Sequence, residues 1–492
     1  MQVCPDLGHR ISLRAVLPEA SFLGGGDVCA AGCTCDWRHL APGDLLVALP
    51  DAGHDHESLA EAAARGCAGV LADRSTDPAA LAGLPVPVCL VADAREAYGR
   101  ICHALVGDPS RQMKVIGVAG THGKTTTSCL IASILTTAGH RIGMLGALGH
   151  LDGRVIEDAV GATPPAGELA TWLARMAHNE CTHAVVEVSS RALEDRHVAG
   201  VRFDAACVTS VVDARLDPQT RNAHRRSKAE LLARLPEEGV AVINADDPLA
   251  AGCVQSHRGP VLTVGIDRAA EIMAIPVEQH LSEQTFLLTA GSETVPVRTP
   301  MIGTEHIYNC LTAAAVGLVY GIDLMTVVRG LEAAGHVPGQ LERIECGQPF
   351  GVFVDEAPTA DALKQALATL RAASAGRVIC VFGTGGHQQQ PCGRWAESLQ
   401  GADRVVVTSD SPTPDNAEAP AAAVLAEMPS SEAVELVLDR AEAIRRALEL
   451  ARPGDCVLIA GMGPQTYPSI DGDSLPLDDA QIARQLLYEM EV

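Results

Sequence analysis

Short apolar runs alternate with longer amphipathic stretches along most of the chain. In about the first hundred residues, the runs predict buried strands within 40–50, 69–73 and 86–93, and an alanine-rich helix over 56–65. Apolar runs bounded by glycine, proline and aspartate are typical of strands, and strands that alternate with helices indicate βαβ units. The pattern therefore predicts a small α/β domain, with a linker at 108–111.

The same alternation continues through two further segments. Strands are predicted at 115–119, 184–190, 203–212 and 239–248, and again within 351–367, 376–386, 403–412 and 455–464. Several of these strands end in acids or hydroxyls, and open parallel sheets bind ligands at the carboxyl ends of their strands. We expect an α/β fold of three domains at 1–108, 109–337 and 338–492, with strands and helices alternating in each.

The stretch 114–130, KVIGVAGTHGKTTTSCL, predicts a strand, a tight glycine turn and a helix. Its centre holds the candidate nucleotide-binding residues Gly120, Thr121, His122, Gly123, Lys124, Thr125 and Thr126. Glycines let the backbone approach a phosphate, and a helix start presents N–H groups and a positive dipole end to it. Lys124 adds a positive charge near the outer phosphates, and the Thr125 hydroxyl is a candidate magnesium ligand.

The spacing departs from the strict G-x-x-x-x-G-K-[ST] pattern, because Val118 stands six residues before Lys124. A chance Gly-Lys-Thr is the competing interpretation, and the strand before it and the apolar helix after it disfavour that interpretation. Glu187, near the end of another predicted strand, could hold the same magnesium as Thr125. A solvated acid at a strand end is the alternative interpretation of Glu187.

Composition and charge limit the partners and the compartment. The 492 residues carry a formal net charge of −24, which disfavours nucleic acid because its phosphates would be repelled over most of the surface. No run approaches the roughly eighteen apolar residues that cross a membrane, and the charged N-terminal stretch lacks the apolar core of a signal peptide. We expect a cytoplasmic protein without membrane insertion.

The sixteen cysteines allow two interpretations. Cys29, Cys33 and Cys35 lie close together in sequence with His39 near them, which leaves a zinc site open. No pair of C-x-x-C motifs is present, however, and most other cysteines stand in apolar runs. Small buried thiols in a reducing cytosol are the favoured interpretation.

Several motifs together carry a resemblance that covers nearly the whole chain. They are G-T-H-G-K-T-T, A-T-P-P at 162–165, E-V-S-S at 187–190, G-V-R-F-D at 200–204, S-K-A-E-L-L at 227–232, I-N-A-D-D-P at 243–248 and V-D-E-A-P-T-A-D-A-L. On these motifs the chain resembles the Mur ligase family. The resemblance implies an N-terminal domain for a UDP sugar, a central ATPase domain, and a Rossmann-like C-terminal domain that carries the incoming amino acid and part of the ATP site.

The resemblance also implies an activity, which is that of the member that adds the third amino acid to UDP-N-acetylmuramoyl-L-alanyl-D-glutamate in peptidoglycan synthesis. In that chemistry ATP phosphorylates a carboxylate, and an amine then attacks the acyl phosphate to give an amide, ADP and phosphate. The implied cofactors are ATP and magnesium, and the implied partners are the UDP-N-acetylmuramoyl-dipeptide and an amino acid. We expect a monomer.

The family's site residues carry over onto matching positions of this chain. The resemblance implies Lys124 and Lys228 as catalytic residues, Thr125, Glu187 and Lys228 at the metal, the phosphate loop with Asn309 and Asp355 at the nucleotide, and Thr163, Ser189 and Arg38 at the substrate. Lys228 matches the family's carbamylated lysine. An ordinary solvated lysine on a helix surface is the alternative interpretation of Lys228.

Other positions depart from the family pattern. Arg215 replaces a metal-binding histidine and cannot ligate a metal, and the remaining departures are Arg191, Gln340, Pro358, Thr413 and Met462. Two functions stay open, a working ligase with an altered substrate and a catalytically impaired paralogue with a regulatory role. A folylpolyglutamate synthetase type is less favoured, because about a hundred residues precede Lys114 and partly resemble the Mur ligase N-terminal domain.

Overall fold

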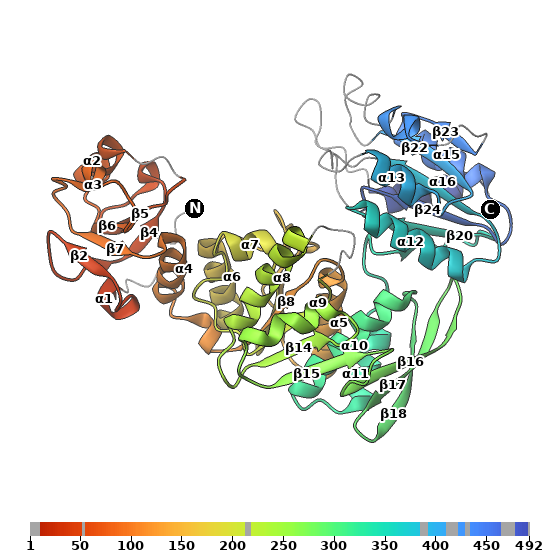
Figure 1. Cartoon of the computed structure of the whole chain (residues 1–492), viewed down its shortest axis with the longest axis horizontal. Helices are drawn as coiled ribbons and strands as arrows, with labels where there is room; N and C mark the ends of the chain where they lie inside the picture. The colour runs from red at the N-terminus through yellow and green to blue at the C-terminus, as the bar shows by residue number, and fades with distance from the viewer. Residues whose placement is uncertain are drawn as a thin grey trace. The chain divides into compact units, whose positions relative to one another are not determined.

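The computed structural model describes residues 10–51, 55–211, 218–383, 392–409, 422–428, 433–463 and 478–490 (Figure 1). It divides into two compact units, one of Met1–Ile272 with Thr312–Gly330 and one of Met273–Leu311 with Leu331–Val492. Both units are built from sheets covered by helices, which confirms the predicted α/β fold class. Within the described residues, no helix combines the length and the apolar character needed to cross a bilayer.

The first unit begins with a five-stranded sheet in the order β2-β7-β6-β5-β4. The strands are β2 (Ser21–Leu23), β4 (Gly32–Thr34), β5 (Asp44–Ala48), β6 (Gly69–Asp73) and β7 (Val88–Val91). The helices are α1 (Leu13–Val16), α2 (His56–Ala64), α3 (Pro78–Leu81) and α4 (Ala94–Leu105). β4 to β7 run parallel, and the helix expected over 56–65 is α2, so the predicted alternation of strands and helices is confirmed here.

The part of the eleven-stranded sheet that belongs to this unit has the order β11-β10-β9-β12-β8-β13-β14-β15. Its strands are β8 (Lys114–Ala119), β9 (Ile142–Gly146), β10 (Gly149–Leu151), β11 (Ile156–Glu157), β12 (His183–Glu187), β13 (Ala205–Val208), β14 (Val240–Asn244) and β15 (Val261–Gly265). All but β10 and β11 are parallel, and Glu187 pairs with Val118 while Val208 pairs with Ala119. The ends of β12 and β13 therefore flank the point where β8 enters the phosphate loop.

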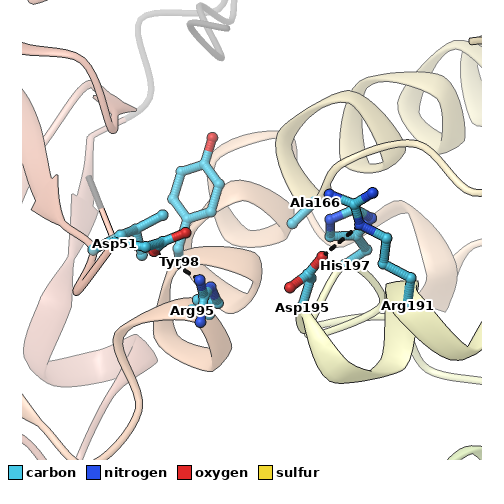
Figure 2. Close-up of a pocket in the computed structure, with 8 residues that line it drawn as sticks. Asp51, Arg95, Tyr98, Ala166, Arg191, Asp195 and His197 are labelled. Carbon is cyan, nitrogen blue, oxygen red and sulfur yellow. Dashed lines mark hydrogen bonds and ion pairs between the residues drawn. The ribbon is translucent and has the colours of Figure 1, made fainter. Parts of the chain in front are cut away.

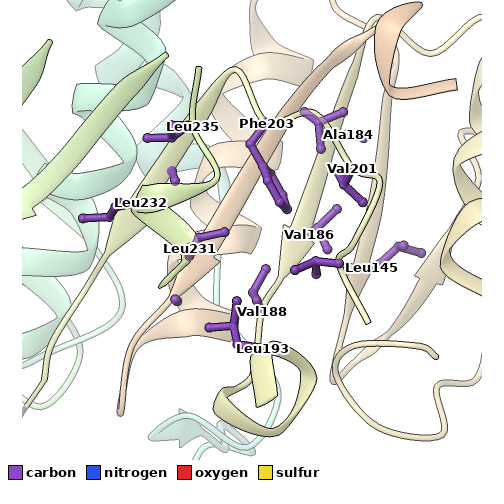
Figure 3. Packing of buried hydrophobic residues seen from close by; sticks show 14 of the residues in the cluster. Leu145, Ala184, Val186, Val188, Leu193, Val201, Phe203, Leu231, Leu232 and Leu235 are labelled. Carbon is purple, nitrogen blue, oxygen red and sulfur yellow. The ribbon is translucent and has the colours of Figure 1, made fainter. Parts of the chain in front are cut away.

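One face of this sheet is buried by α6 (Ala166–His178) and α8 (Pro218–Ala233), as Figure 3 shows for part of the cluster. Phe203 is fully buried there with Leu231, and a Cβ on Gly117 of β8 would lie 3.0 Å from the Phe203 ring. Glycine at 117 thus leaves room for the ring, and truncating such a ring to alanine costs about 3–5 kcal/mol. Helix α5 (Lys124–Thr137) contacts β12 and β9.

The second unit opens with consecutive strands, β16 (Ile272–Gln279), β17 (Gln284–Ala290) and β18 (Glu293–Thr299). β17 and β18 form an antiparallel hairpin in which Gln284 pairs with Thr299. The expected strand–helix alternation up to 337 is therefore wrong over this stretch. Phe286 and Leu288 are buried, two residues apart, which is the periodicity of a half-buried strand. Two helices follow, α10 (Thr304–Val319) and α11 (Leu324–Ala333).

The C-terminal sheet has the order β19-β20-β24-β21-β22-β23. Its strands are β19 (Glu342–Arg343), β20 (Gly351–Asp355), β21 (Val378–Gly383), β22 (Arg404–Thr408), β23 (Val434–Leu436) and β24 (Cys456–Ala460). Its described helices include α12 (Ala360–Ala373), α13 (Cys392–Leu399), α15 (Arg440–Leu450) and α16 (Asp479–Glu489). All strands except β19 run parallel, and separate apolar clusters cover the sheet, as the repeated pattern predicts.

Three predicted strands extend beyond the observed ones, and the one predicted over 239–248 is β14 alone. The strand expected over 184–190 ends at Glu187, because the Ser189 hydroxyl accepts a hydrogen bond from the Ala192 amide (3.1 Å) and caps α7 (Ser190–Glu194). The strand expected over 203–212 is β13 alone, and the expected linker at 108–111 contains a short 3₁₀ turn, η2 (Pro109–Arg111). The hydroxyl-bearing residues predicted at these strand ends do not pair in the sheet and instead make loop and cap contacts.

Candidate functional site

The predicted phosphate loop lies between the end of β8 at Ala119 and the start of α5 at Lys124. Gly123, at the N-cap, has φ +80° and ψ 0°, a left-handed conformation that glycine adopts without strain. Among the described residues no side chain caps α5, so its first turn presents backbone N–H groups and the positive dipole end to an anion. The sequence prediction of a strand, a turn and a helix opening at Lys124 is confirmed.

Residues that follow β13 hold this loop in place through a brace of hydrogen bonds. The Thr209 hydroxyl donates a hydrogen bond to the His122 carbonyl (2.6 Å), and the Thr121 amide donates to the Ser210 carbonyl (2.8 Å). A Cβ on Gly120 would lie only 1.9 Å from the Thr209 hydroxyl oxygen. Sequence reasoning missed this brace, although a Thr-Ser pair directly after a buried strand is a signal that could have pointed to it.

The Lys124 side chain folds back over the loop. Its ammonium donates to the carbonyls of Gly120 (3.0 Å) and Thr121 (3.3 Å). The charge therefore lies beside the same backbone that would surround a phosphate, and an incoming phosphate can replace neutral carbonyls as its partner.

Thr125 and Glu187 meet beside the loop. The Thr125 hydroxyl donates to Glu187 Oε2 (3.0 Å), and the Ala147 amide donates to Oε1 (3.2 Å). Glu187 is only 1 % exposed, and this burial raises the pKa of its carboxyl, against the opposing charge of Lys124. A carboxylate and a hydroxyl next to a phosphate site are oxygen ligands of the kind magnesium uses, so these residues fit the ion. The alternative of a solvated strand-end acid is wrong for Glu187.

Two expected substrate residues lie next to Glu187. The Thr163 hydroxyl donates to the Glu187 carbonyl (2.7 Å) and accepts from the Ser189 amide (3.0 Å). The structure thus brings Thr163 and Ser189 together, as the sequence prediction requires. Their hydrogen bonds fix the segment that leads from β12 into α7.

Lys228 lies on α8 and is only 2 % exposed. Its ammonium donates to the Ser190 hydroxyl (2.9 Å). Burial, and then the charge of Lys124, lowers the pKa of Lys228 to about 8. The interpretation as a solvated helix-surface lysine is therefore wrong, and an amine with this pKa is partly neutral near physiological pH, the form that reacts with carbon dioxide.

A cavity of about 250 Å³ lies between α4 and the α7 region (Figure 2). Its lining residues are Leu49, Asp51, Arg95, Tyr98, Ala166, Arg191, Asp195 and His197. Ion pairs join Arg95 to Asp51 (2.7 Å) on one side and Arg191 to Asp195 (3.3 Å) on the other. Burial lowers the pKa of His197, so its ring is neutral at physiological pH. The cavity is thus lined by two guanidinium groups, each paired with a carboxylate of the same lining.

The other expected site residues lie in separate parts of the chain. Arg38 is in the N-terminal domain, where its guanidinium bonds to Asp36 (2.9 Å). Asn309, on α10, and Asp355, at the end of β20, belong to the second unit. Asp355 accepts hydrogen bonds from the amides of Leu341 and Ala357 (both 2.8 Å), while burial raises the pKa of its carboxyl to about 6.

Among the positions that depart from the family pattern, Arg215 and Thr413 lie outside the described residues. Pro358 is exposed in the turn between β20 and α12, and Met462 is buried after β24. Arg191 lines the cavity described above.

The structure favours buried thiols over a metal site for the cysteines. Within the described ranges, no group of three or more histidine, cysteine or acidic side chains is placed to hold a metal ion, so the zinc interpretation finds no support. Cys33 is buried and contacts Cys102, with their sulfur atoms 3.6 Å apart. Most cysteines of the apolar runs are buried free thiols, as expected.

A phosphate loop on a parallel sheet, a buried carboxylate beside it and a buried lysine on another helix are features of an α/β enzyme that handles nucleotide phosphates. The profile of the Mur ligase middle domain matches residues 118–317, and that of the Mur ligase, glutamate ligase domain matches 339–463. The chain belongs to the Mur ligase family, and by class it is an ATP-dependent acid–amino-acid ligase.

Similar proteins cover nearly the full length. A UDP-N-acetylmuramoyl-L-alanyl-D-glutamate–2,6-diaminopimelate ligase of Syntrophomonas wolfei is 34% identical and covers 93% of this chain and 94% of its own. A solved structure of a ligase with that name has a TM-score of 0.71 at 26% identity and covers 98% of this chain and 100% of its own. Folylpolyglutamate synthase of Mycobacterium tuberculosis shares the fold over 74% of this chain and 92% of its own, with a TM-score of 0.62 at 20% identity.

Proposed function

We propose that this protein joins an amino acid to UDP-N-acetylmuramoyl-L-alanyl-D-glutamate in the synthesis of a peptidoglycan precursor. The relatives that match over nearly the whole chain carry the name of a ligase for this substrate. The observation that carries the proposal is the convergence of Lys124, Thr125, Glu187 and Lys228 at one edge of one sheet. Those groups are what transfer of a phosphoryl group to a carboxylate requires.

The residues at the phosphate loop have distinct roles in this proposal. The loop 120–126 holds the ATP phosphates, and Lys124 balances the charge of the transferred group. Thr125 and Glu187 are the ligands of a magnesium ion, which supplies charge neutralisation on the phosphates. Lys228, as a carbamate, supplies a further negative group for metal binding. Asn309 and Asp355 are further nucleotide-binding residues in this proposal.

The acid substrate occupies the first unit in this proposal. Thr163, Ser189 and the cavity beside them receive the dipeptide end, and Arg38 lies in the domain that receives the UDP end. The domains have boundaries near 108 and 337, so that residues 1–108 form the UDP-sugar domain and 338–492 the amino-acid domain. The protein acts as a cytoplasmic monomer.

The reaction balances on these groups. A carboxylate oxygen of the dipeptide attacks the terminal phosphorus of ATP and ADP leaves, which gives an acyl phosphate. The amine of the incoming amino acid then attacks the acyl carbon, phosphate leaves, and the ammonium proton passes to solvent. The prearranged cations stabilise the charge that builds up on the transferred phosphoryl group.

A catalytically impaired paralogue with a regulatory role is the second candidate. The observation that favours it is Pro358, which is exposed in the turn after β20 at a position where the resemblance calls for a histidine. Such a protein would keep the phosphate loop and bind ATP or a UDP sugar without forming an amide.

Phosphate release from ATP separates the two functions. Purified protein is incubated with magnesium, UDP-N-acetylmuramoyl-L-alanyl-D-glutamate and each amino acid in turn, with Lys124→Ala as the control. We expect one amino acid or a small group to give release that depends on both the dipeptide and Lys124. Release at the level of the control with every amino acid, together with retained ATP binding, would leave only the paralogue.

A further inference from the structure

Five charged residues form a network between α4 of the N-terminal domain and α8 of the central domain. Arg196 Nε lies 2.9 Å from Asp93 Oδ2, and the Arg196 guanidinium also contacts Glu230. Arg234 donates to both carboxylate oxygens of Glu96 (3.1 and 2.8 Å) and to Glu230 (3.1 Å). The exposed fractions of these side chains run from 17% for Arg234 to 41% for Asp93. Glu230 joins the two arginines and lies two residues beyond Lys228.

The backbone of Arg196 is unusual. It follows α7 with φ +60°, a left-handed conformation that disfavours any residue with a Cβ and suits glycine. Its amide and its guanidinium both donate to the Leu193 carbonyl (3.2 Å each). An unfavourable conformation persists where its surroundings hold it. At this position the side chain contributes to that hold, because its acidic partners Asp93, Glu96 and Glu230 lie on other elements.

The residues on either side of Arg196 belong to the cavity. Asp195 and His197 line it, as Figure 2 shows, while Arg196 between them faces the network. Helix α4 repeats this arrangement, since Arg95 and Tyr98 line the opposite wall and Glu96 pairs with Arg234. The ionic network and the cavity therefore share the same two segments, and the network links the two walls.

We propose that Arg196 is a positioning residue, which holds Asp195 and His197 as one wall of the cavity against α4 and so sets the affinity for the acid substrate. The proposal rests on the proposed function for the identity of that substrate. Arg196 itself does not line the cavity, so its effect passes through its neighbours. The nucleotide step is separate, because the network contains no residue of the phosphate loop.

Arg234 provides a matched control. It is an arginine of the same network and shares Glu230 with Arg196, but it lies beyond the C-terminal end of α8 and neither it nor its neighbours line the cavity. Arg234→Gln removes two ion pairs, those with Glu96 and Glu230. It leaves Arg196 with its three acidic partners, so residues 195–197 keep their link to α4. A merely structural role for the network predicts the same outcome for both variants.

The first experiment measures the kinetics of the full chain. We expect Arg196→Gln to raise KM for UDP-N-acetylmuramoyl-L-alanyl-D-glutamate about tenfold or more, with KM for ATP and kcat within about twofold. Arg196→Lys, which keeps the charge but can reach fewer acceptors, should recover part of the loss. Arg234→Gln should lower the unfolding midpoint while leaving KM for the dipeptide within about threefold. An unchanged KM in Arg196→Gln, or an equal rise in Arg234→Gln, would overturn the proposal.

Amide hydrogen exchange tests the same idea without any substrate. The His197 amide donates to the Ala192 carbonyl (2.8 Å), so its protection reports whether the wall is held. We expect exchange of residues 195–199 to accelerate about tenfold or more in Arg196→Gln and to stay near wild type in Arg234→Gln. Equal exchange in both variants would contradict the proposal. If wild type failed to turn over any dipeptide, the proposed function would fall and this measurement alone would decide the role of Arg196.

Discussion

Thr125 and Glu187 lie 62 residues apart in sequence, and the hydroxyl of the first donates to the carboxylate of the second over 3.0 Å. Glu187 ends β12, and Thr125 lies in the first turn of α5, the helix that follows β8. Because β8 and β12 are neighbours in the sheet, the contact is a consequence of the topology. A Cβ on Gly146 of β9 would lie 2.2 Å from Glu187 Oε1, which shows how closely the backbone surrounds this carboxylate. The fold thus places a hydroxyl of the phosphate-loop motif beside a buried carboxylate, and the two residues together form a candidate metal site.

Glu187→Gln should remove the charge that holds magnesium while keeping nearly the same volume. We expect ATP turnover at saturating magnesium to fall by about 10²–10³-fold, since electrostatic stabilisation of a transferred group is of this size. The measurement is a magnesium titration of phosphate release. Thr125→Ser, which keeps the hydroxyl, is the control and should remain within about threefold of wild type. Full magnesium dependence in Glu187→Gln would show that the carboxylate is not a ligand.

Gly120→Ala should impair nucleotide binding through a steric clash in the phosphate loop. The new methyl group would lie 1.9 Å from the Thr209 hydroxyl oxygen, so either the loop or β13 must move. We expect ADP affinity, measured by calorimetry, to fall about tenfold or more. Gly120→Ala combined with Thr209→Ala should recover part of this loss, because the clashing oxygen is gone. No recovery in the double variant, with Thr209→Ala alone binding normally, would place the clash elsewhere.

The ion pair of Arg440 with Asp479 joins α15 to α16 in the second unit. Two hydrogen bonds of 2.7 Å connect them, and their side chains are 5% and 0% exposed. Arg440→Met should lower the free energy of unfolding of that unit by about 3–5 kcal/mol, because it leaves an unpaired buried carboxylate. Urea unfolding measures the change. Arg440→Met with Asp479→Leu should restore much of the stability, and an equally unstable double variant would contradict the electrostatic explanation.

The phosphate loop could be predicted from sequence because every feature that defines it is local. A strand, two glycines and a helix start follow one another within 114–130. The Thr209 hydroxyl that braces the loop reaches the carbonyl of His122, 87 residues earlier, and no local pattern reports such a contact. Sequence reasoning therefore located the loop but missed what holds it in shape.

Burial was harder to predict for charged residues than for apolar ones. Lys228 stands in a helix whose mean composition is polar, and that pattern favours a solvated side chain, yet the lysine is 2 % exposed. Arg196 and its acidic partners were missed for the same reason, because charges that pair across domains look like ordinary surface charges. The hairpin of β17 and β18 is a different error, since its period-two pattern was present in the sequence.

The buried amine of Lys228 should make the free energy of unfolding depend on pH. The pKa of Lys228 is about 8 in the folded protein against 10.5 for an ordinary lysine amine, so between these values the unfolded chain binds a proton that the folded chain does not. The free energy of unfolding therefore increases with pH through this window. Below pH 8 it carries the full cost of burying the charged amine.

Lys228→Met does not titrate and provides the reference for this measurement. In buffer free of carbon dioxide, the unfolding free energy of wild type relative to Lys228→Met should increase by about 2 kcal/mol between pH 7 and pH 10. Adding bicarbonate should stabilise wild type near pH 8 and leave Lys228→Met unchanged, because only a neutral amine forms a carbamate. A difference that stays constant with pH would mean that Lys228 keeps its charge when folded, and the proposed carbamate would lose its chemical basis.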